Sequence, residues 1–264
     1  KSWVWEQYDH TVMGDTVQKP GGDAAVIRIK GTSKALSIST DCNGRYVYLN
    51  PRSGGKIAVS ESARNVVCSG AKPLAITNCL NFGNPTDPEI YWQFRESVLG
   101  IGDACRMFDT PVTGGNVSFY NESNLGAVYP TPVIGMVGVI EDNSKIVDLS
   151  YKTPGDMIVS LGSINGSLGG SEYLKQVHGI VQGPIPSVDL EIEKNLQDFC
   201  LDTISRGVIK SAHDISDGGV ASSITEMTFG NEIGCSVMIE SELSTERVLF
   251  SETGGFIFEV AEEN

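Results

Sequence analysis

The first half of the chain alternates between short apolar segments with a period of two and longer ones with a period of three to four. Residues 24–32 (AAVIRIKGT) and 35–43 (ALSISTDCN) predict two strands joined by a polar turn. In the first of these segments, Ala25, Ile27 and Ile29 alternate with the other residues, which is typical of a half-buried strand. The two segments are therefore expected to be neighbours in one sheet.

Two helices and a further strand are predicted next. Residues 54–71 have helical spacing and end near Gly70, and residues 72–83 predict a strand. Residues 88–109 predict a second helix that begins with a proline and has Asp87 as its cap. Its buried stripe is expected to consist of Trp92, Val98, Leu99, Ile101 and Met107.

The strand-like Val-Ser-Phe-Tyr segment at residues 117–120 and a long strand over residues 128–142 follow, which makes the order strand-strand-helix-strand-helix-strand-strand. This order predicts an α+β domain over about residues 22–142, with helices on one face of a single sheet. The polar, Pro-Gly-containing segment 148–156 predicts a boundary between a domain of residues 1–150 and a domain of residues 151–264.

The second domain is also predicted to be an α+β unit. A long helix is expected to turn Leu196, Phe199 and Ile204 inward, and the Asp-Gly-Gly turn that begins at Asp217 leads into a further helix. The predicted elements are strands at 156–163, 235–240 and 254–260, and helices at 169–179 and 191–207.

Composition and charge exclude several classes of protein. The 264 residues carry a formal charge of −14, which repels polyanions and argues against general nucleic-acid binding. No apolar run is long enough to span a bilayer, so no membrane partner is expected. The six cysteines occur singly, as in a reduced cytoplasmic protein. Both ends of the sequence have the character of cut ends, so a piece of a longer polypeptide is expected.

The segment TPVTGGNVSFYNES, residues 110–123, has two readings. Gly114 and Gly115 followed by Asn116 are ordinary turn chemistry. The same bare backbone could approach a phosphate closely, and the side-chain oxygens of Asn116 and Ser118 could ligate Mg²⁺ or bind a ligand. The residues by themselves leave both readings open.

Three other positions could carry chemistry. Asp41 follows an apolar strand and could bind Mg²⁺ or cap the next turn. Asn78 lies near a strand end, where ligand contacts are common. In HDISDGG, Asp214 and Asp217 flank a turn into a helix, where they could serve an anion-binding site or Asp217 could cap the helix. A hydrolase triad around His213 is unsupported, because no serine or cysteine nucleophile occupies a recognisable elbow.

Taken together, residues 60–85, 110–123 and 213–219 resemble phosphoribosylformylglycinamidine synthase, in particular the second half of its small, multi-subunit type. The QYD, STDCN and LFSETGG segments add to the resemblance, which covers nearly the whole chain. It implies the fold of the aminoimidazole ribonucleotide synthetase superfamily, here an N-terminal α+β domain followed by a truncated α/β domain. It also implies an ATP-dependent ligase of purine biosynthesis that converts formylglycinamide ribonucleotide and glutamine-derived ammonia to the amidine.

The resemblance assigns roles to four residues. Asn78 and Gly115 would contact ATP, Asn116 would ligate Mg²⁺, and Ser118 would contact the ribonucleotide substrate. The family has an aspartate where this chain has Asn78, so a hydrogen bond is retained and a charge is lost. Asp41, Asp214 and Asp217 are weaker candidates.

The catalytic histidines of the family lie in its other half, and no SHNHP-like stretch occurs here, so no catalytic residue is expected in this chain. The implied partners are the first half of the enzyme, a glutaminase subunit and a small accessory subunit. A homodimer through the sheet face that the halves share is a further expectation. Two alternatives are another ATP-dependent enzyme of the superfamily and a non-catalytic half that holds nucleotide or completes a partner's site.

Overall fold

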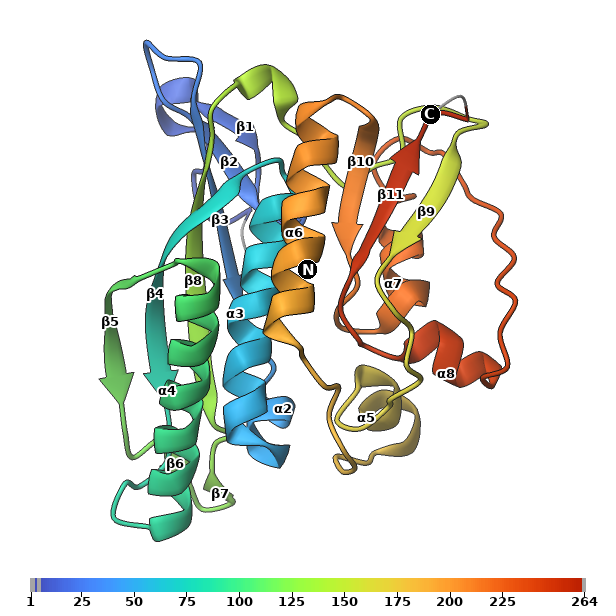
Figure 1. The fold of residues 1–264 in the computed structure, drawn as a ribbon. Coiled ribbons are helices and arrows are strands. Elements are labelled where there is room, and N and C mark those ends of the chain that lie inside the picture. The colour runs from blue at the N-terminus through green and yellow to red at the C-terminus, as the bar shows by residue number, and fades with distance from the viewer. Residues whose placement is uncertain (1–2, 4–5, 263–264) are drawn as a thin grey trace.

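The structure, a computed structural model, describes residue 3 and residues 6–262. Residues 1–2, 4–5 and 263–264 lie outside the described residues. The first residues of the predicted domain 1–150 and the last two of the predicted domain 151–264 are among them. Two sheets and the helices between them form the molecule (Figure 1). The order of the larger sheet is β1-β2-β3-β8-β4-β5 and that of the smaller is β10-β11-β9, with a separate β6-β7 hairpin.

The elements of the N-terminal part agree closely with the expected order. The predicted second helix and its aspartate cap are confirmed, because the Asp87 carboxylate accepts a hydrogen bond of 2.8 Å from the Glu89 backbone N–H. A short helix, α2, was not predicted from the sequence. The elements are η1 (Val12–Gly14), β1 (Thr16–Gln18), β2 (Ala25–Arg28), β3 (Ala35–Asp41), α2 (Gly44–Leu49), α3 (Pro51–Cys68), β4 (Lys72–Asn81), α4 (Pro88–Phe108), β5 (Val112–Ser118), β6 (Glu122–Ser123), β7 (Gly126–Ala127), β8 (Thr131–Ile140) and η2 (Asn143–Lys145).

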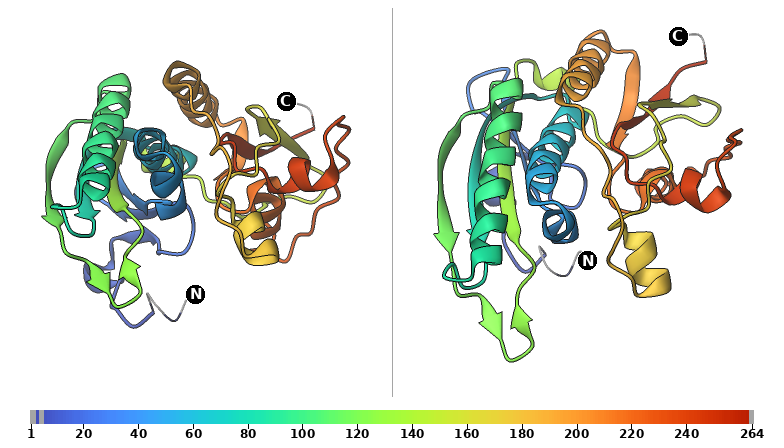
Figure 2. Two further views of the ribbon diagram at one scale, coloured as in Figure 1. Left: turned by 90° about the horizontal axis from the view of Figure 1, so that it is seen from below. Right: turned by 60° about the horizontal axis from the view of Figure 1, so that its bottom comes forward.

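Helices α3 and α4 cover one face of the six-stranded sheet (Figures 1 and 2). The expected apolar face of the first strand was wrong: Val26 is fully buried beneath the helices, whereas Ile27 is 38% exposed. Alternation along the neighbouring strand agrees, since Ser37 is buried and Ile38 is 37% exposed. The second face of the sheet thus carries apolar side chains that the described helices leave open.

The expected buried stripe of α4 was largely wrong. Ile101 is buried, but Trp92, Val98 and Met107 are 50%, 40% and 38% exposed. Small residues make the contact with α3 instead, because a Cβ atom at Gly100 would overlap the Arg52 carbonyl group. The close approach of the α3 and α4 backbones therefore decides which residues of α4 are buried. The apolar pattern of the sequence does not decide it.

The C-terminal part contains a three-stranded sheet. The predicted strands at 156–163 and 254–260 are present as β9 and β11, but residues 235–240 form no strand. The long helix is present as α6, in which Ile204 is buried and Phe199 is 53% exposed, against expectation. The elements are β9 (Met157–Leu161), α5 (Glu172–His178), α6 (Leu190–Ser205), β10 (Ile209–Asp214), α7 (Gly219–Glu226), α8 (Thr245–Phe250) and β11 (Phe256–Val260).

Helix α3 joins the two parts of the molecule. It contacts β3 and β8 on one side and α6 and β10 on the other, and 14 of its residues are buried. The six cysteines are free, which confirms that no disulfide framework is present. In the described part of the chain, no helix is both long and apolar enough to cross a bilayer.

Candidate functional site

The motif at residues 110–123 is an edge strand followed by a turn. Val112–Ser118 forms β5, which runs parallel to β4, so the expectation of a turn at Gly114 and Gly115 was wrong. Gly115 lies directly across from Asn78 in this pairing. A Cβ atom at Gly115 would collide with the carboxamide oxygen of Asn78 and lie 2.5 Å from its carbonyl oxygen. Strand packing therefore requires glycine at this position, whatever binds there.

The pairing of β4 with β5 divides the candidate residues between two faces. Asn116 pairs with Cys79 and Ser118 pairs with Asn81, and these four residues share the face that α3 and α4 leave open. Asn78 alternates to the helix-covered face. Asn116 is exposed and Ser118 is half-buried. These two predicted ligand residues therefore belong to one solvent-facing wall of the sheet.

Asn121 is a polar residue in the same motif that the sequence did not single out. Its side-chain N–H groups donate to the carbonyl oxygens of Phe82 (3.0 Å) and Ser118 (2.9 Å). Its side-chain oxygen is 3.3 Å from the Ser118 hydroxyl oxygen and accepts from that hydroxyl. Asn121 thus holds the turn after β5 and orients Ser118. The spacing of three residues between Ser118 and Asn121 was the sequence feature that could have indicated this contact.

The three weaker aspartate candidates lie together where the two parts of the molecule meet. Asp41 ends β3 and accepts a hydrogen bond of 3.0 Å from Asn65 in α3, so it does not cap the next turn. Asp214 ends β10 and lies 3.4 Å from the Arg64 guanidinium. Asp217 accepts from the Asn43 carboxamide at 2.9 Å.

Asp217 is not a helix cap. The N-cap residue of α7 is Gly218, at a φ of 83°, and no side chain caps this helix. Glu252 lies beside the start of this helix, where its carboxylate accepts from the Gly218 N–H at 2.8 Å and also from the Tyr46 hydroxyl. Glu252 is 34 residues from Gly218 along the chain, so the sequence around Gly218 gave no sign of this contact.

Burial and mutual repulsion raise the pKa values of this group of carboxyls. Burial, followed by Asp214 and Asp217, raises the pKa of Asp41 to about 7. Burial raises the pKa of Asp214 to about 6, although Arg64 acts to lower it. Burial and then Asp41 raise the pKa of Glu61 well above its ordinary value. The cluster therefore holds more negative groups than its single buried arginine can neutralise.

A cavity of about 360 Å³ opens beside this cluster. Glu61, Arg64 and Asp217 line it, together with Ser60, whose buried hydroxyl has no hydrogen-bond partner among the residues that the structure describes. Arg64 is held by Glu193 of α6 at 3.1 Å and is only 4% exposed. The cavity thus has a fixed cation, several carboxyls and an unsatisfied hydroxyl on its wall.

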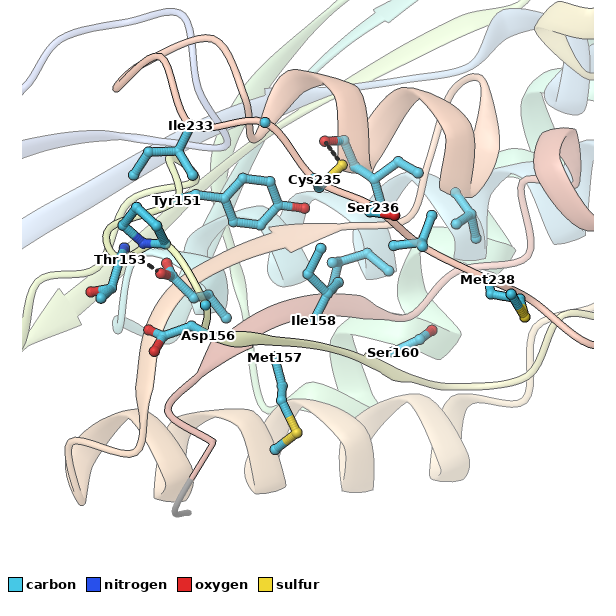
Figure 3. Close-up of a pocket in the computed structure, with 18 of the residues that line it drawn as sticks. Tyr151, Thr153, Asp156, Met157, Ile158, Ser160, Ile233, Cys235, Ser236 and Met238 are labelled. Atoms are coloured by element: carbon cyan, nitrogen blue, oxygen red, sulfur yellow. Dashed lines mark hydrogen bonds between the residues drawn. The ribbon is translucent and has the colours of Figure 1, made fainter.

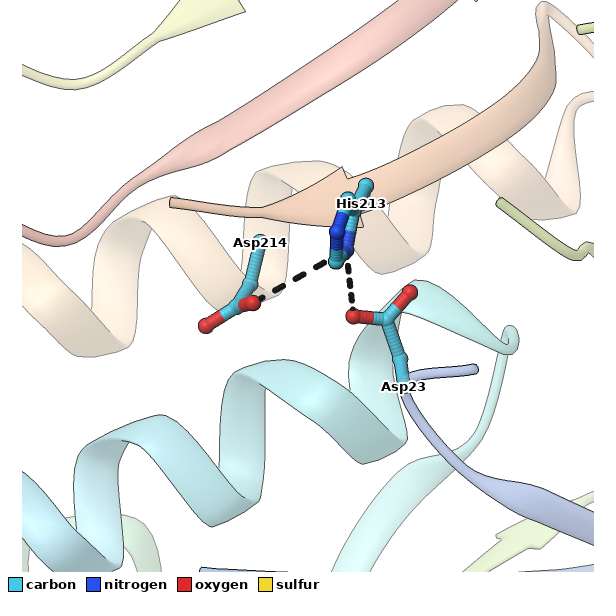
Figure 4. Close-up of side chains that lie close together, drawn as sticks. All are labelled: Asp23, His213 and Asp214. Carbon is cyan, nitrogen blue, oxygen red and sulfur yellow. Dashed lines mark hydrogen bonds and ion pairs between the residues drawn. The ribbon is translucent and has the colours of Figure 1, made fainter. Parts of the chain in front are cut away.

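His213 lies on the other side of Asp214 (Figure 4). Its Nδ1 is 2.7 Å from Asp23 Oδ1 and its Nε2 is 3.0 Å from Glu226 Oε2. Burial acts to lower the pKa of His213, but the Asp23 and Glu226 carboxylates raise it well above its ordinary value. The donor atoms of Asp23, His213 and Asp214 lie within 4.8 Å of one another, a spacing that a metal ion could use. Both ring nitrogens face carboxylates, so the imidazolium links residues on either side of the domain junction.

Two family models match the chain in succession. AIR synthase related protein, N-terminal domain, matches residues 21–140, and AIR synthase related protein, C-terminal domain, matches residues 153–264. The chain belongs to the AIR synthase related protein family. The resemblance seen in the sequence motifs is confirmed, and the α+β arrangement agrees with this family.

Among members of the AIR synthase related family, the chain is similar to phosphoribosylformylglycinamidine synthase subunit PurL of Alkaliphilus metalliredigens. It is 54% identical to that protein over 253 residues, which are 96% of this chain and 34% of the relative. The chain therefore spans about a third of the length of the curated relatives that it matches.

Solved structures agree with this relationship. The structure of PurLQS from Thermotoga maritima has a TM-score of 0.72 and 25% identity, and the match covers 98% of this chain and 38% of that one. T. maritima PurL complexed with ATP matches with a TM-score of 0.68 and 26% identity, over 99% and 38% of the two chains. The complex with FGAR matches with a TM-score of 0.65 and 25% identity, over 98% and 37%.

Proposed function

We propose that this chain is one part of a phosphoribosylformylglycinamidine synthase. The reaction joins ammonia to formylglycinamide ribonucleotide, with conversion of ATP to ADP and phosphate. The observation that supports this function best is the pairing of β4 with β5, which brings two motifs of the resemblance side by side, with Gly115 across from Asn78 and with Asn116 and Ser118 on the open face. Similarity to a PurL subunit over 96% of the chain supports the same conclusion.

The proposed role of the β5 wall is to position two substrates. The ATP phosphates would contact the exposed backbone at Gly115, and Asn78 packs against that backbone from β4. Ser118 would contact the ribonucleotide, with its hydroxyl held by Asn121. We assign no acid, base or nucleophile to this wall, and its proposed contribution is positioning and transition-state stabilisation.

Mg²⁺ is part of the proposed site, and the residues fit it in part. Asn116 offers one exposed carboxamide oxygen, which is a ligand type that hard cations accept. Octahedral Mg²⁺ needs further oxygens, which substrate phosphates and the other part of the enzyme would supply. When bound, the ion neutralises phosphate charge during transfer.

Asp41, Asp214 and Asp217 form the second candidate cation site. Their support is the surplus of carboxyls around Arg64 and the cavity that adjoins them. A bound divalent cation would replace the protons that these groups retain. This site is separate from the β5 wall, because Asp41 lies on the sheet face that α3 covers, whereas Asn116 and Ser118 lie on the other face.

The proposed partners follow from the open sheet face. Ile27, Ile38 and the ligand residues Asn116 and Ser118 share that face, so a homologous half packed against it would both cover apolar surface and complete the site. We propose the first half of the enzyme as this partner and a homodimer when this chain is alone. The glutaminase and small accessory subunits and a cytoplasmic location remain part of the proposal.

Nucleotide binding by the purified chain tests the function. Calorimetric titration with ATP and Mg²⁺ is expected to give binding that Asn116→Ala weakens, while Asn124→Ala in the exposed hairpin loop has no effect. The chain is expected to give no ATP-dependent amidine formation by itself. Binding that is unaffected by Asn116→Ala would contradict the assigned wall, and turnover by this chain would contradict its proposed dependence on a partner.

A further inference from the structure

A cavity of about 400 Å³ lies where α2, the start of α4 and the end of the β6–β7 hairpin meet (Figure 1). Tyr48 of α2, Gln93 of α4 and residues 127–130, which lead from β7 into β8, form its walls. No residue of the β5 wall lines it. The cavity is therefore outside the site proposed for ATP.

This cavity differs in character from the larger one beside the C-terminal sheet (Figure 3). The larger cavity measures about 890 Å³, is mainly apolar, and has Tyr151 as the one aromatic residue in its described lining. The smaller cavity is mainly polar and has two aromatic walls, Tyr48 and Tyr129. A small charged ligand therefore fits the smaller cavity better, because a buried charge needs polar partners.

The two aromatic walls contact each other edge to face. The ring centroids of Tyr48 and Tyr129 are 5.2 Å apart and the ring planes are inclined at 74°. Both residues remain partly open to solvent, with exposed fractions of 47% and 45%. The face of an aromatic ring attracts a cation, so two adjoining rings form a corner that suits a positively charged group.

The charged residues in the described lining of the cavity are both acidic. One oxygen of Asp87 accepts a hydrogen bond of 2.8 Å from the Glu89 backbone N–H. Neither Asp87 nor Glu89 forms an ion pair with a described residue. Their two charges outweigh the partial positive charge of about one half at the N-terminus of α4. The electrostatics of the cavity therefore favour a cation.

Gln93 is independent evidence for a ligand. It is 7% exposed and lines the cavity. Its carboxamide has no hydrogen-bond partner in the part of the chain that the structure describes. A buried carboxamide whose oxygen and N–H groups lack partners costs free energy, and an N–H donor of a ligand would satisfy the oxygen.

We propose that this cavity binds a guanidinium group. A guanidinium is planar and permanently charged, stacks on aromatic rings, and donates N–H groups to carboxylates and carboxamide oxygens. Tyr48 and Tyr129 provide the stacking walls, Asp87 and Glu89 the opposite charges, and Gln93 the buried acceptor. An arginine in a polypeptide and a free small molecule offer this same chemistry. The inference goes beyond the proposed function and does not depend on it.

A titration of the ¹⁵N-labelled chain followed by NMR tests the ligand class. N-acetylarginine amide represents arginine in a polypeptide, and agmatine represents a free small molecule. N-acetylcitrulline amide is the matched control, because it has nearly the same shape and no charge. The guanidinium probes are expected to shift the amide signals of residues 87–93 and 127–130, and the citrulline control is expected to bind at least about tenfold more weakly.

The stronger of the two guanidinium probes identifies the source of the ligand. Tighter binding of N-acetylarginine amide indicates a polypeptide, and tighter binding of agmatine indicates a small molecule. Equal binding of the citrulline control overturns the proposal, as does the absence of a saturable shift at these residues with both guanidinium probes.

Substitutions in the lining test the assigned contacts. Glu89→Gln and Tyr129→Leu, both at exposed positions, are each expected to weaken binding by about two- to fivefold. Glu191→Gln is the matched control for the first, because Glu191 is also an exposed glutamate in the first turn of a helix. Equal weakening by Glu89→Gln and Glu191→Gln overturns the proposal.

The side-chain amide signal of Gln93 reports on the cavity directly. Gln93→Leu removes this signal and so identifies it in the spectrum of the unaltered chain. The Gln93 signal is expected to shift with the same saturation as the backbone signals. A Gln93 signal that is unchanged when the guanidinium probe is saturating overturns the proposal.

Discussion

Asn78 and Gly115 face each other across the β4–β5 pair so closely that the carboxamide of one occupies the space of a Cβ atom on the other. The adjacent Gly114 has no atom within 4 Å of its Cβ position. Packing therefore requires glycine at position 115 but not at position 114. Substitution of each residue in turn can show whether the effect is on strand packing.

We expect Gly115→Ala to lower the free energy of unfolding by about 1–3 kcal/mol, because Asn78 must move and an edge strand must shift. Gly114→Ala is the matched control and is expected to change it by less than about 1 kcal/mol. Urea denaturation followed by circular dichroism measures both. If the two variants are equally stable, the close contact between Asn78 and Gly115 is not a constraint on the strand.

The same pair of residues shows what the sequence could predict. Composition and spacing predicted the strands and helices of the larger sheet, and the motif resemblance predicted the family. They could not predict that Gly115 lies within a strand, because a Gly-Gly-Asn sequence is equally suited to a turn. They also missed Glu252, whose partner Gly218 is 34 residues away along the chain, and Asn121, which binds the nearby Ser118.

Side-chain burial was less predictable than element type for a physical reason. Trp92, Val98 and Met107 of α4 face outward because small residues such as Ser97 and Gly100 allow its backbone to approach α3. On β2, the apolar Ile27 belongs to a sheet face that no described helix covers. An apolar pattern indicates that one face of a helix or strand will be covered. It does not indicate whether a helix of the same chain or another protein covers that face.

Helix packing gives a prediction with opposite signs at two glycines of α4. Gly100→Ala would overlap the Arg52 carbonyl group, whose carbon would be 2.9 Å from the new Cβ, and we expect a loss of about 1–3 kcal/mol. At Gly102 the nearest atom is the flexible guanidinium of Arg106, at 3.2 Å. Gly102→Ala is therefore expected to gain up to about 1 kcal/mol from helix propensity. Thermal unfolding distinguishes the two, and a stabilised Gly100→Ala would contradict the close α3–α4 contact.

The buried carboxyls predict that stability falls as the pH rises. The pKa values of Asp41, Asp214 and Glu252 are raised to about 7, about 6 and about 7, chiefly by burial. The folded state therefore binds more protons than the unfolded state above their ordinary values of 3.8 and 4.5. Their stabilising contribution is complete below those values and is lost as the pH rises through about 6 to 7.

We expect the free energy of unfolding to fall by a few kcal/mol, as an order of magnitude, between about pH 5 and about pH 8. Asp41→Asn, which cannot ionise, should flatten this dependence, and the exposed Asp202→Asn should not. Urea denaturation at several pH values measures the slope. A free energy of unfolding that rises across this range would show that these carboxyls are ionised in the fold.

The open sheet face predicts the oligomeric state of the chain. Ile38 lies on that face and is 37% exposed, and Asn116 lies on the same face of the sheet. We expect sedimentation equilibrium to show a reversible dimer, because pairing of two such faces removes apolar surface from water. Ile38→Lys places two buried charges at that interface and is expected to weaken dimerisation by at least about tenfold.

Phe199→Lys is the control, because Phe199 is equally apolar and 53% exposed but lies on α6, away from the sheet face. A monomer at all concentrations, or a dimer that Phe199→Lys disrupts and Ile38→Lys does not, would place any interface elsewhere.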